Sequence, residues 1–185
     1  MGYPKALLNM RGETYLERIY KTLIAGGCEE VFAVGGAHQS RLRQMKPKGL
    51  KLIHNPHWAQ GMRSSLNRGL RAMGHGAVVL THVDRPAVQA STISILTTHG
   101  GCKPLVPTFR GQSGHPVWLP EWMKAQLLSD LKSPLRDVLR RCGVMQLNVD
   151  DPGILLNINT PIDHAIFGAM THKTASHACI ETRSV

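Results

Sequence analysis

The stretch that decides the fold is Ala77-Val78-Val79-Leu80-Thr81-His82-Val83-Asp84-Arg85-Pro86. Its short apolar run predicts a buried strand over residues 77–83. Asp84 follows at the carboxyl end of that strand, which is the edge where α/β sheets bind ligands. A carboxylate at such a strand end is a natural Mg²⁺ ligand beside phosphates. An ordinary turn aspartate before a proline fits the same residues equally well.

Strands and helices alternate on both sides of this stretch. Helices are predicted over residues 14–24, 37–45, 63–73, 92–98, 121–129, 135–142 and 162–170. Further strands are predicted over residues 31–34, 50–54, 105–109, 116–119 and 144–149. This alternation indicates an α/β three-layer sandwich with a mainly parallel, Rossmann-like sheet. We expect one domain over residues 1–170 and a loose, polar tail over residues 171–185.

Charge is spread unevenly along the 185 residues, whose formal net charge is +10. No acidic residue lies between Glu30 and Asp84, a segment that holds eight cations: Arg41, Arg43, Lys46, Lys48, Lys51, Arg63, Arg68 and Arg71. Such a field attracts polyanions, and a nucleic acid, a nucleoside triphosphate or a generically basic surface would each account for it. Aromatic residues make up only 5% of the chain and no base-stacking pattern occurs, which disfavours nucleic acid.

Composition also bears on the compartment and on membranes. No apolar run reaches transmembrane length, and no secretory leader is visible, so we expect no membrane partner. The four cysteines are scattered without CxxC spacing, which is typical of reduced thiols in a cytoplasmic protein.

Several short motifs have the residue types that phosphate chemistry requires. Gly2-Tyr3-Pro4-Lys5 has the composition of a phosphate-handling turn, although a plain solvated turn is the alternative interpretation. A loop entering a helix follows later in the chain, and its free N–H groups and hydroxyls can contact a nucleotide. In chain order the remaining motifs are Asn55-Pro56 with Gly61-Met62-Arg63-Ser64-Ser65-Leu66, Val83-Asp84-Arg85-Pro86, Gly114-His115-Pro116-Val117, Asp150-Asp151-Pro152-Gly153 and Asn157-Ile158-Asn159-Thr160-Pro161.

In this order and spacing the motifs resemble the MobA-like nucleotidyltransferases, and most closely the molybdenum cofactor cytidylyltransferase branch. The resemblance covers about residues 1–168 and implies a fold of the nucleotide-diphospho-sugar transferase type. That family opens with a strand and a Gly-rich loop of the form Leu-Ala-Ala-Gly-x-Ser-x-Arg-Met-Gly, of which only Met1 and Gly2 are present. We therefore expect a sheet that lacks its first strand, and a chain that is less active and less stable than a version carrying that segment.

The resemblance also implies roles for individual residues. Lys5 and Asp84 would be catalytic, and Asp84 with Asn159 would hold Mg²⁺. Nucleotide binding would fall to Gly2, Lys5, Gly61, Met62, Ser64 and Ser65, and acceptor binding to Gly114, His115 and Pro116. A lone histidine such as His115 is also compatible with a purely structural role. Asn159 and Arg85 depart from the family pattern, which often has Asp and a Gln or Met at these positions.

The function implied is transfer of CMP from CTP, rather than GMP from GTP, to a phosphorylated acceptor of the molybdopterin type, with release of pyrophosphate. A molybdoenzyme or its maturation factor would be the protein partner. Two alternatives stay open: a catalytically impaired or accessory protein of the same fold, and a basic nucleic-acid-binding protein.

Overall fold

The structure, a computed structural model, describes residues 4–168. Its α-helices are α1 (Tyr15–Ala25), α2 (Gln39–Met45), α3 (Met62–Ala72), α4 (Ala90–Thr98), α5 (Glu121–Ser129) and α6 (Leu135–Cys142), and residues 161–168 are also helical. Three 3₁₀ turns are η1 (Lys5–Leu7), η2 (Trp58–Gln60) and η3 (Pro152–Ile154). The strands are β1 (Asn9–Met10), β2 (Glu13–Thr14), β3 (Phe32–Gly35), β4 (Lys51–His54), β5 (Val78–Leu80), β6 (Leu105–Phe109), β7 (Gln112–Ser113), β8 (Val117–Leu119) and β9 (Met145–Asn148).

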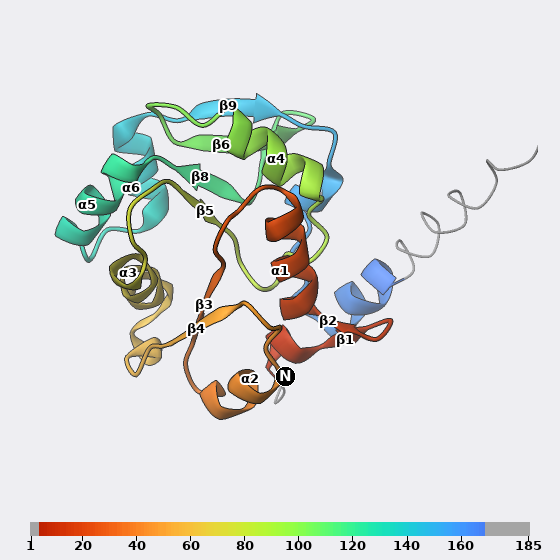
Figure 1. Cartoon of the computed structure of the whole chain (residues 1–185). Coiled ribbons are helices and arrows are strands. Elements are labelled where there is room, and N and C mark those ends of the chain that lie inside the picture. The colour runs from red at the N-terminus through yellow and green to blue at the C-terminus, as the bar shows by residue number, and fades with distance from the viewer. Residues whose placement is uncertain (1–3, 169–185) are drawn as a thin grey trace, which may run out of the picture.

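The strands form separate sheets within the described residues. β3 and β4 pair in parallel, and β1 and β2 make a small antiparallel hairpin. A larger mixed sheet has the order β5-β8-β6-β7, with β9 parallel to β6 and the other pairs antiparallel. In Figure 1, β3 and β4 lie in the lower half of the molecule and the larger sheet in the upper half.

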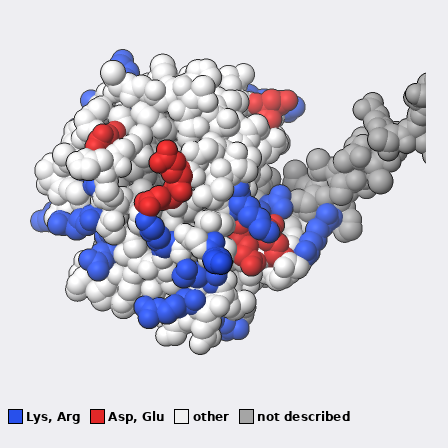
Figure 2. Space-filling view, viewed as in Figure 1, with Lys and Arg blue, Asp and Glu red and all other residues white. Residues whose placement is uncertain are grey.

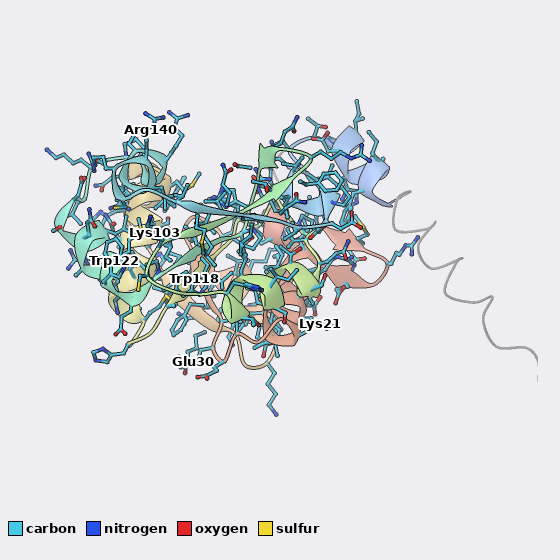
Figure 3. All side chains as sticks on the ribbon, turned by 90° about the horizontal axis from the view of Figure 1, so that it is seen from above. Lys21, Glu30, Lys103, Trp118, Trp122 and Arg140 are labelled. Atoms are coloured by element: carbon cyan, nitrogen blue, oxygen red, sulfur yellow. The ribbon has the colours of Figure 1, made fainter. Side chains whose placement is uncertain are left out.

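Helices cover both faces of these strands. α1 and α4 pack together on one face, and α3 and α5 pack together on the other (Figures 1 and 3). The sequence favours α1 where it stands, because Thr14 and Glu17 form a reciprocal capping box at its first turn. The predicted α/β three-layer arrangement is confirmed.

A large cleft separates the two main sheets. Its volume is about 1680 Å³, and it is bounded by β3 on one side and β5 on the other. The buried core is divided in the same way: one cluster centres on α1, β3 and β4, and a second centres on β5, β8, α3 and α5. The expectation of a sheet without its first strand therefore agrees with two strand groups that do not hydrogen-bond to each other.

The larger sheet holds the best-packed strand, β8, whose three residues are all buried. Figure 3 shows Trp118 of β8 toward the middle of the molecule, whereas Trp122 of α5 lies nearer the margin. Trp118 is 8% exposed and Trp122 is 46% exposed, and the Trp122 indole donates to the Cys102 carbonyl at 2.9 Å.

Most predicted elements are confirmed within one or two residues. The strand predicted over residues 77–83 is shorter, because only Val78–Leu80 pairs with β8 and residues 81–83 lead into the loop at Asp84. Sequence periodicity missed the two-residue strands β1, β2 and β7, which are too short to show it. The tail predicted over residues 171–185 lies outside the described residues.

Candidate active site

The loop after β5 carries the central carboxylate of the site. Asp84 is half-buried, and its Oδ1 atom is buried without a hydrogen-bond partner in the described part of the chain. Its backbone carbonyl accepts from the Ile158 amide at 2.8 Å, which holds the Asn157–Thr160 segment beside it. A buried, unpartnered carboxylate oxygen is costly unless a donor or a cation binds it.

Lys5 and Asn159 meet next to Asp84, although 154 residues separate them in the sequence. The Lys5 ammonium donates to the Asn159 side-chain oxygen at 2.6 Å. The Asn159 segment is itself held by Asp163, whose carboxylate accepts from the Thr160 and Asn159 amides at 2.8 and 2.9 Å. These amide hydrogen bonds lower the pKa of Asp163, and the bond from Thr160 has the largest effect. The positive charge of Lys5 lowers the pKa further by a smaller amount. The structure thus pairs Lys5 with Asn159, and the neighbouring Ile158 amide ties this segment to the backbone of Asp84.

The acceptor loop predicted at Gly114, His115 and Pro116 packs against η3. The His115 amide donates to the Ile154 carbonyl at 3.1 Å, and the Arg85 guanidinium donates to the same oxygen at 2.7 Å. A Cβ atom on Gly114 would lie 2.4 Å from that oxygen, so only glycine permits this close approach. Arg85, which follows Asp84, is therefore tied to the acceptor loop.

Two histidines stack beside this loop. The His82 and His115 rings meet edge to face, with centroids 4.5 Å apart and an interplanar angle of 70°. Burial lowers the pKa of His115 to about 4, and the neighbouring His82 and Arg85 add to the effect. Burial also lowers the pKa of His82. Both rings are therefore neutral at pH 7, where each can donate one hydrogen bond and accept another.

The loop predicted to bind nucleotide begins at Gly61, whose φ of 94° is in the glycine-favoured region, and enters α3. Buried Asn55 organises it by donating to the Ser64 and Ser65 hydroxyls at 2.8 and 3.1 Å. The Ser64 hydroxyl is also within 2.9 Å of the His57 carbonyl and 3.0 Å of the Gly61 carbonyl, so its hydrogen-bonding capacity is used locally. No hydrogen-bond acceptor for the Ser65 hydroxyl is seen among residues 4–168.

Several cations of the acid-free segment, residues 31–83, donate to backbone carbonyls and so have structural roles. Arg63 turns away from the loop and donates to the Leu127 and Asp130 carbonyls at 2.5 and 2.6 Å, where α5 ends. Arg68 donates to the His54 carbonyl at 3.1 Å and Lys46 to the Leu50 carbonyl at 2.7 Å. Figure 2 shows Lys and Arg side chains gathered over the lower part of one face, with few acids among them. A basic surface remains, but not every cation in it is available for a ligand.

The cleft between the sheets opens onto both binding loops. Met62 and Ser65 line it on the nucleotide side, and Gly114, His115 and Arg85 line it on the acceptor side. Lys5, Asp84 and Asn159 are not part of its lining. Gly2 lies outside the described residues. The sequence analysis gave no role to His82 and Asn55. His82 could have been noticed because it lies two residues before Asp84, after the same strand.

Within residues 4–168 no cluster of three His, Cys, Asp or Glu side chains could hold a metal by itself. A cation at Asp84 would therefore need ligands from a bound phosphate, which is how Mg²⁺ is commonly held. In the same part of the chain, no helix has the length and apolar character needed to cross a membrane.

The family model of the MobA-like NTP transferase domain matches residues 1–147. The chain belongs to this family. Membership of this family accounts for the α/β fold, and the matched residues include the loop after β5 and the Gly61–Ser65 loop.

Three proteins that are similar to this MobA-like protein carry different names. The molybdenum cofactor cytidylyltransferase of Escherichia coli (strain K12) is 25% identical over 169 residues, covering 88% of this chain and 86% of that protein. Nicotine blue oxidoreductase of Paenarthrobacter nicotinovorans is 33% identical over 99 residues, covering 52% of this chain and only 48% of that protein, about half its length. The crystal structure of Rv0371c from Mycobacterium tuberculosis H37Rv in complex with manganese has a TM-score of 0.74 at 23% identity, covering 91% of this chain and 93% of that chain.

Proposed function

We propose that this nucleotidyltransferase-family protein transfers CMP from CTP to a phosphorylated acceptor of the molybdopterin type. The observation that carries the proposal is the buried, unpartnered Asp84 oxygen at the end of β5, with the Lys5–Asn159 pair beside it. The choice of CTP over GTP rests on the relative named a cytidylyltransferase, which matches over most of its length. The reaction would take place in the cytoplasm, and the product would pass to a molybdoenzyme or its maturation factor.

The proposed reaction is an in-line displacement at phosphorus. A terminal phosphate oxygen of the acceptor attacks the α-phosphorus of CTP and forms a new P–O bond. The bond between the α-phosphorus and the oxygen bridging to the β-phosphate breaks, and that oxygen leaves with its electron pair as pyrophosphate. No covalent enzyme intermediate is required, so the protein contributes positioning and electrostatic stabilisation.

Asp84 suits a bound Mg²⁺, because its Oδ1 oxygen has no other partner in the described residues. Asn159 would join it if its side-chain oxygen exchanged the Lys5 ammonium, from which it accepts at 2.6 Å, for the metal. Mg²⁺ bound there would neutralise negative charge on the triphosphate. Lys5 would add a mobile positive charge on the same side and offset the charge that develops on the departing pyrophosphate. Asp163 orients this group by holding the backbone of Asn159 and Thr160.

The two loops would hold the two substrates. The N-terminus of α3, with Gly61, Met62 and the Ser64 and Ser65 region, would face the nucleotide, with the Ser65 hydroxyl proton as one donor. Gly114, His115 and Pro116 would face the acceptor, with Arg85 fixed to the same Ile154 carbonyl as His115. The His115 ring is neutral at pH 7 and is already hydrogen-bonded to the Leu80 backbone, so its other ring nitrogen would accept a hydrogen bond and the ring would contribute no charge.

The test is pyrophosphate release from Mg-CTP in the presence of the acceptor. Asp84→Asn keeps the size of the side chain and removes the charge, and it should lower turnover by more than the roughly 10–100-fold that loss of an outer metal-site partner costs. Asp150→Asn, an exposed carboxylate, is the matched control and should leave turnover unchanged. Wild-type turnover by a folded Asp84→Asn protein would remove Asp84 from the mechanism.

Calorimetry with Mg-CTP and Mg-GTP tests the nucleotide assignment. Ser65→Ala should weaken CTP binding, while Ser91→Ala on the exposed side of α4 should not. Tighter binding of GTP would overturn the choice of base. Saturable CTP binding without pyrophosphate release would assign an accessory role, and salt-sensitive oligonucleotide binding without CTP binding would assign a nucleic-acid-binding role.

A further inference from the structure

We propose that the Arg85 guanidinium binds the phosphate group of the acceptor and thereby determines which acceptor the site takes. This inference rests on the proposed function and extends it from a class of reaction to one binding residue and its ligand. Binding of phosphate alone tests it separately, because that binding requires neither CTP nor turnover.

Most of the hydrogen-bonding capacity of Arg85 is unused. Its Nη1 atom donates to the Ile154 carbonyl at 2.7 Å, and no other hydrogen bond of this guanidinium is seen within residues 4–168. A guanidinium carries several N–H donors in a planar fork that matches two oxygens of one phosphate group. The side chain is half-buried, and a charge-assisted hydrogen bond is stronger in such surroundings than in open water.

No acidic side chain balances the charge of Arg85. Asp84 precedes it in the chain, yet neither Asp84 nor any other carboxylate of residues 4–168 forms an ion pair with the guanidinium. A half-buried charge without a partner is costly, and a bound anion reduces that cost. The charge of Arg85 therefore favours an anionic ligand over a neutral one.

One backbone carbonyl fixes Arg85 beside the acceptor loop. The Ile154 carbonyl accepts from Arg85 and, at 3.1 Å, from the His115 amide. Gly114 lies against the same oxygen, since a Cβ atom on Gly114 would be only 2.4 Å from it. Arg85, Gly114 and His115 all line the cleft. The guanidinium is thus held next to the acceptor loop before a ligand arrives, which lowers the entropic cost of binding.

The other cations that line the cleft belong to a different region of it. They are Arg63 of α3, Lys132 between α5 and α6, and Arg136 and Arg140 of α6. Arg63 donates to backbone carbonyls at the end of α5, and both α6 arginines lie 3.8 Å from the Asp137 carboxylate. Within the described chain, Arg85 is therefore the cleft-lining cation that is tied to the acceptor loop.

The first experiment measures binding of inorganic phosphate by NMR, without CTP or Mg²⁺, with the His82 and His115 ring signals as local reporters. The wild type should show saturable shifts of these signals. Arg85→Gln should weaken phosphate binding at least roughly tenfold, because the charge-assisted hydrogen bonds are lost. Arg85→Lys keeps the charge without the planar fork and should lie between the two.

Arg68→Gln is the matched control. Arg68 also donates to a backbone carbonyl, that of His54 at 3.1 Å, and it does not line the cleft. This variant should bind phosphate as the wild type does. Equal phosphate affinity in the wild type and Arg85→Gln would overturn the proposal. If Arg85→Gln failed to fold, wild-type affinity in Arg85→Lys would overturn the proposed two-oxygen contact instead.

The second experiment separates the two substrates by steady-state kinetics. Arg85→Gln should raise KM for the acceptor at least roughly tenfold and leave KM for CTP unchanged. A rise in KM for CTP alone would assign Arg85 to the nucleotide and overturn the proposal, and acetate binding as tight as phosphate binding would overturn the choice of phosphate. Phosphate binding that depends on Arg85 in a protein without turnover would support the phosphate site and contradict only the proposed reaction.

Discussion

β3 and β8 are both short, apolar strands, but they differ in burial. All three residues of β8 are buried, whereas three of the four residues of β3 are only half-buried. β8 lies between β5 and β6, while β3 has β4 as its single partner in the described chain. Neighbours on both edges, more than the strand's own composition, therefore decide how deeply a strand is buried.

The largest expected effect on stability comes from replacing one leucine by alanine in each of the two main sheets. Leu119→Ala in β8 should lower the free energy of unfolding by about 2–5 kcal/mol, because Leu119 is 2% exposed and tightly packed. Leu52→Ala in β4 should cost less than about 2 kcal/mol, because that side chain is only half-buried. Urea denaturation measures both. Equal losses would show that the β3–β4 side is packed as well as the larger sheet.

The second expected effect is a pH dependence at the end of β5, where the two halves meet. His115 has a folded pKa of about 4, below the usual 6.5, so between these values the unfolded chain binds more protons than the folded one. Stability contributed by neutral His115 is present above pH 6.5 and is lost as pH falls toward 4. His115→Gln should flatten the fall of stability between pH 7 and pH 4.

Urea midpoints at pH 7, 6, 5 and 4 measure this effect. His57→Gln is the matched control, since that side chain is exposed and no hydrogen bond of its ring is seen in residues 4–168. A variant at His115 with the same pH profile as the wild type would contradict the prediction.

The third effect concerns α1, which covers the β3 side of the cleft. Thr14→Ala removes the capping box, in which the Thr14 hydroxyl and the Glu17 carboxylate satisfy each other's backbone amides at 3.2 and 2.8 Å. The expected loss is about 0.5–2 kcal/mol in the free energy of unfolding. Thr14→Ser retains the hydroxyl and should recover most of it. If serine were no better than alanine, packing of the threonine methyl group would be the cause.

The smallest effect is expected at the surface of the β3–β4 sheet. Lys51 of β4 forms an ion pair with Glu30, and the two side chains are 53% and 55% exposed. Exposed pairs contribute about 0–1 kcal/mol, and salt screens them. A double-mutant cycle with Glu30→Gln and Lys51→Met should give a coupling within that range at low salt. A larger coupling would mean that this sheet depends on its charges more than on its packing.

Local sequence was enough for most of the secondary structure. The periodicity of α1, its capping residues, and the apolar run that ends at Asp84 are properties of a few consecutive residues, so their positions could be predicted. The family motifs likewise named residues for phosphate chemistry, and these roles stay predictions. Strand ends were less accurate, because pairing with β8 and not composition ended β5 at Leu80.

Tertiary structure decided which side chains meet. Lys5 and Asn159 are far apart in the sequence and meet in the fold, and Arg63 donates to backbone carbonyls at the end of α5. The His82–His115 contact and the division into two sheets arise in the same way, from packing between segments far apart in the chain. Short-range backbone preferences determine helices and strands, whereas long-range burial determines their partners, and only the second determines the geometry of a site.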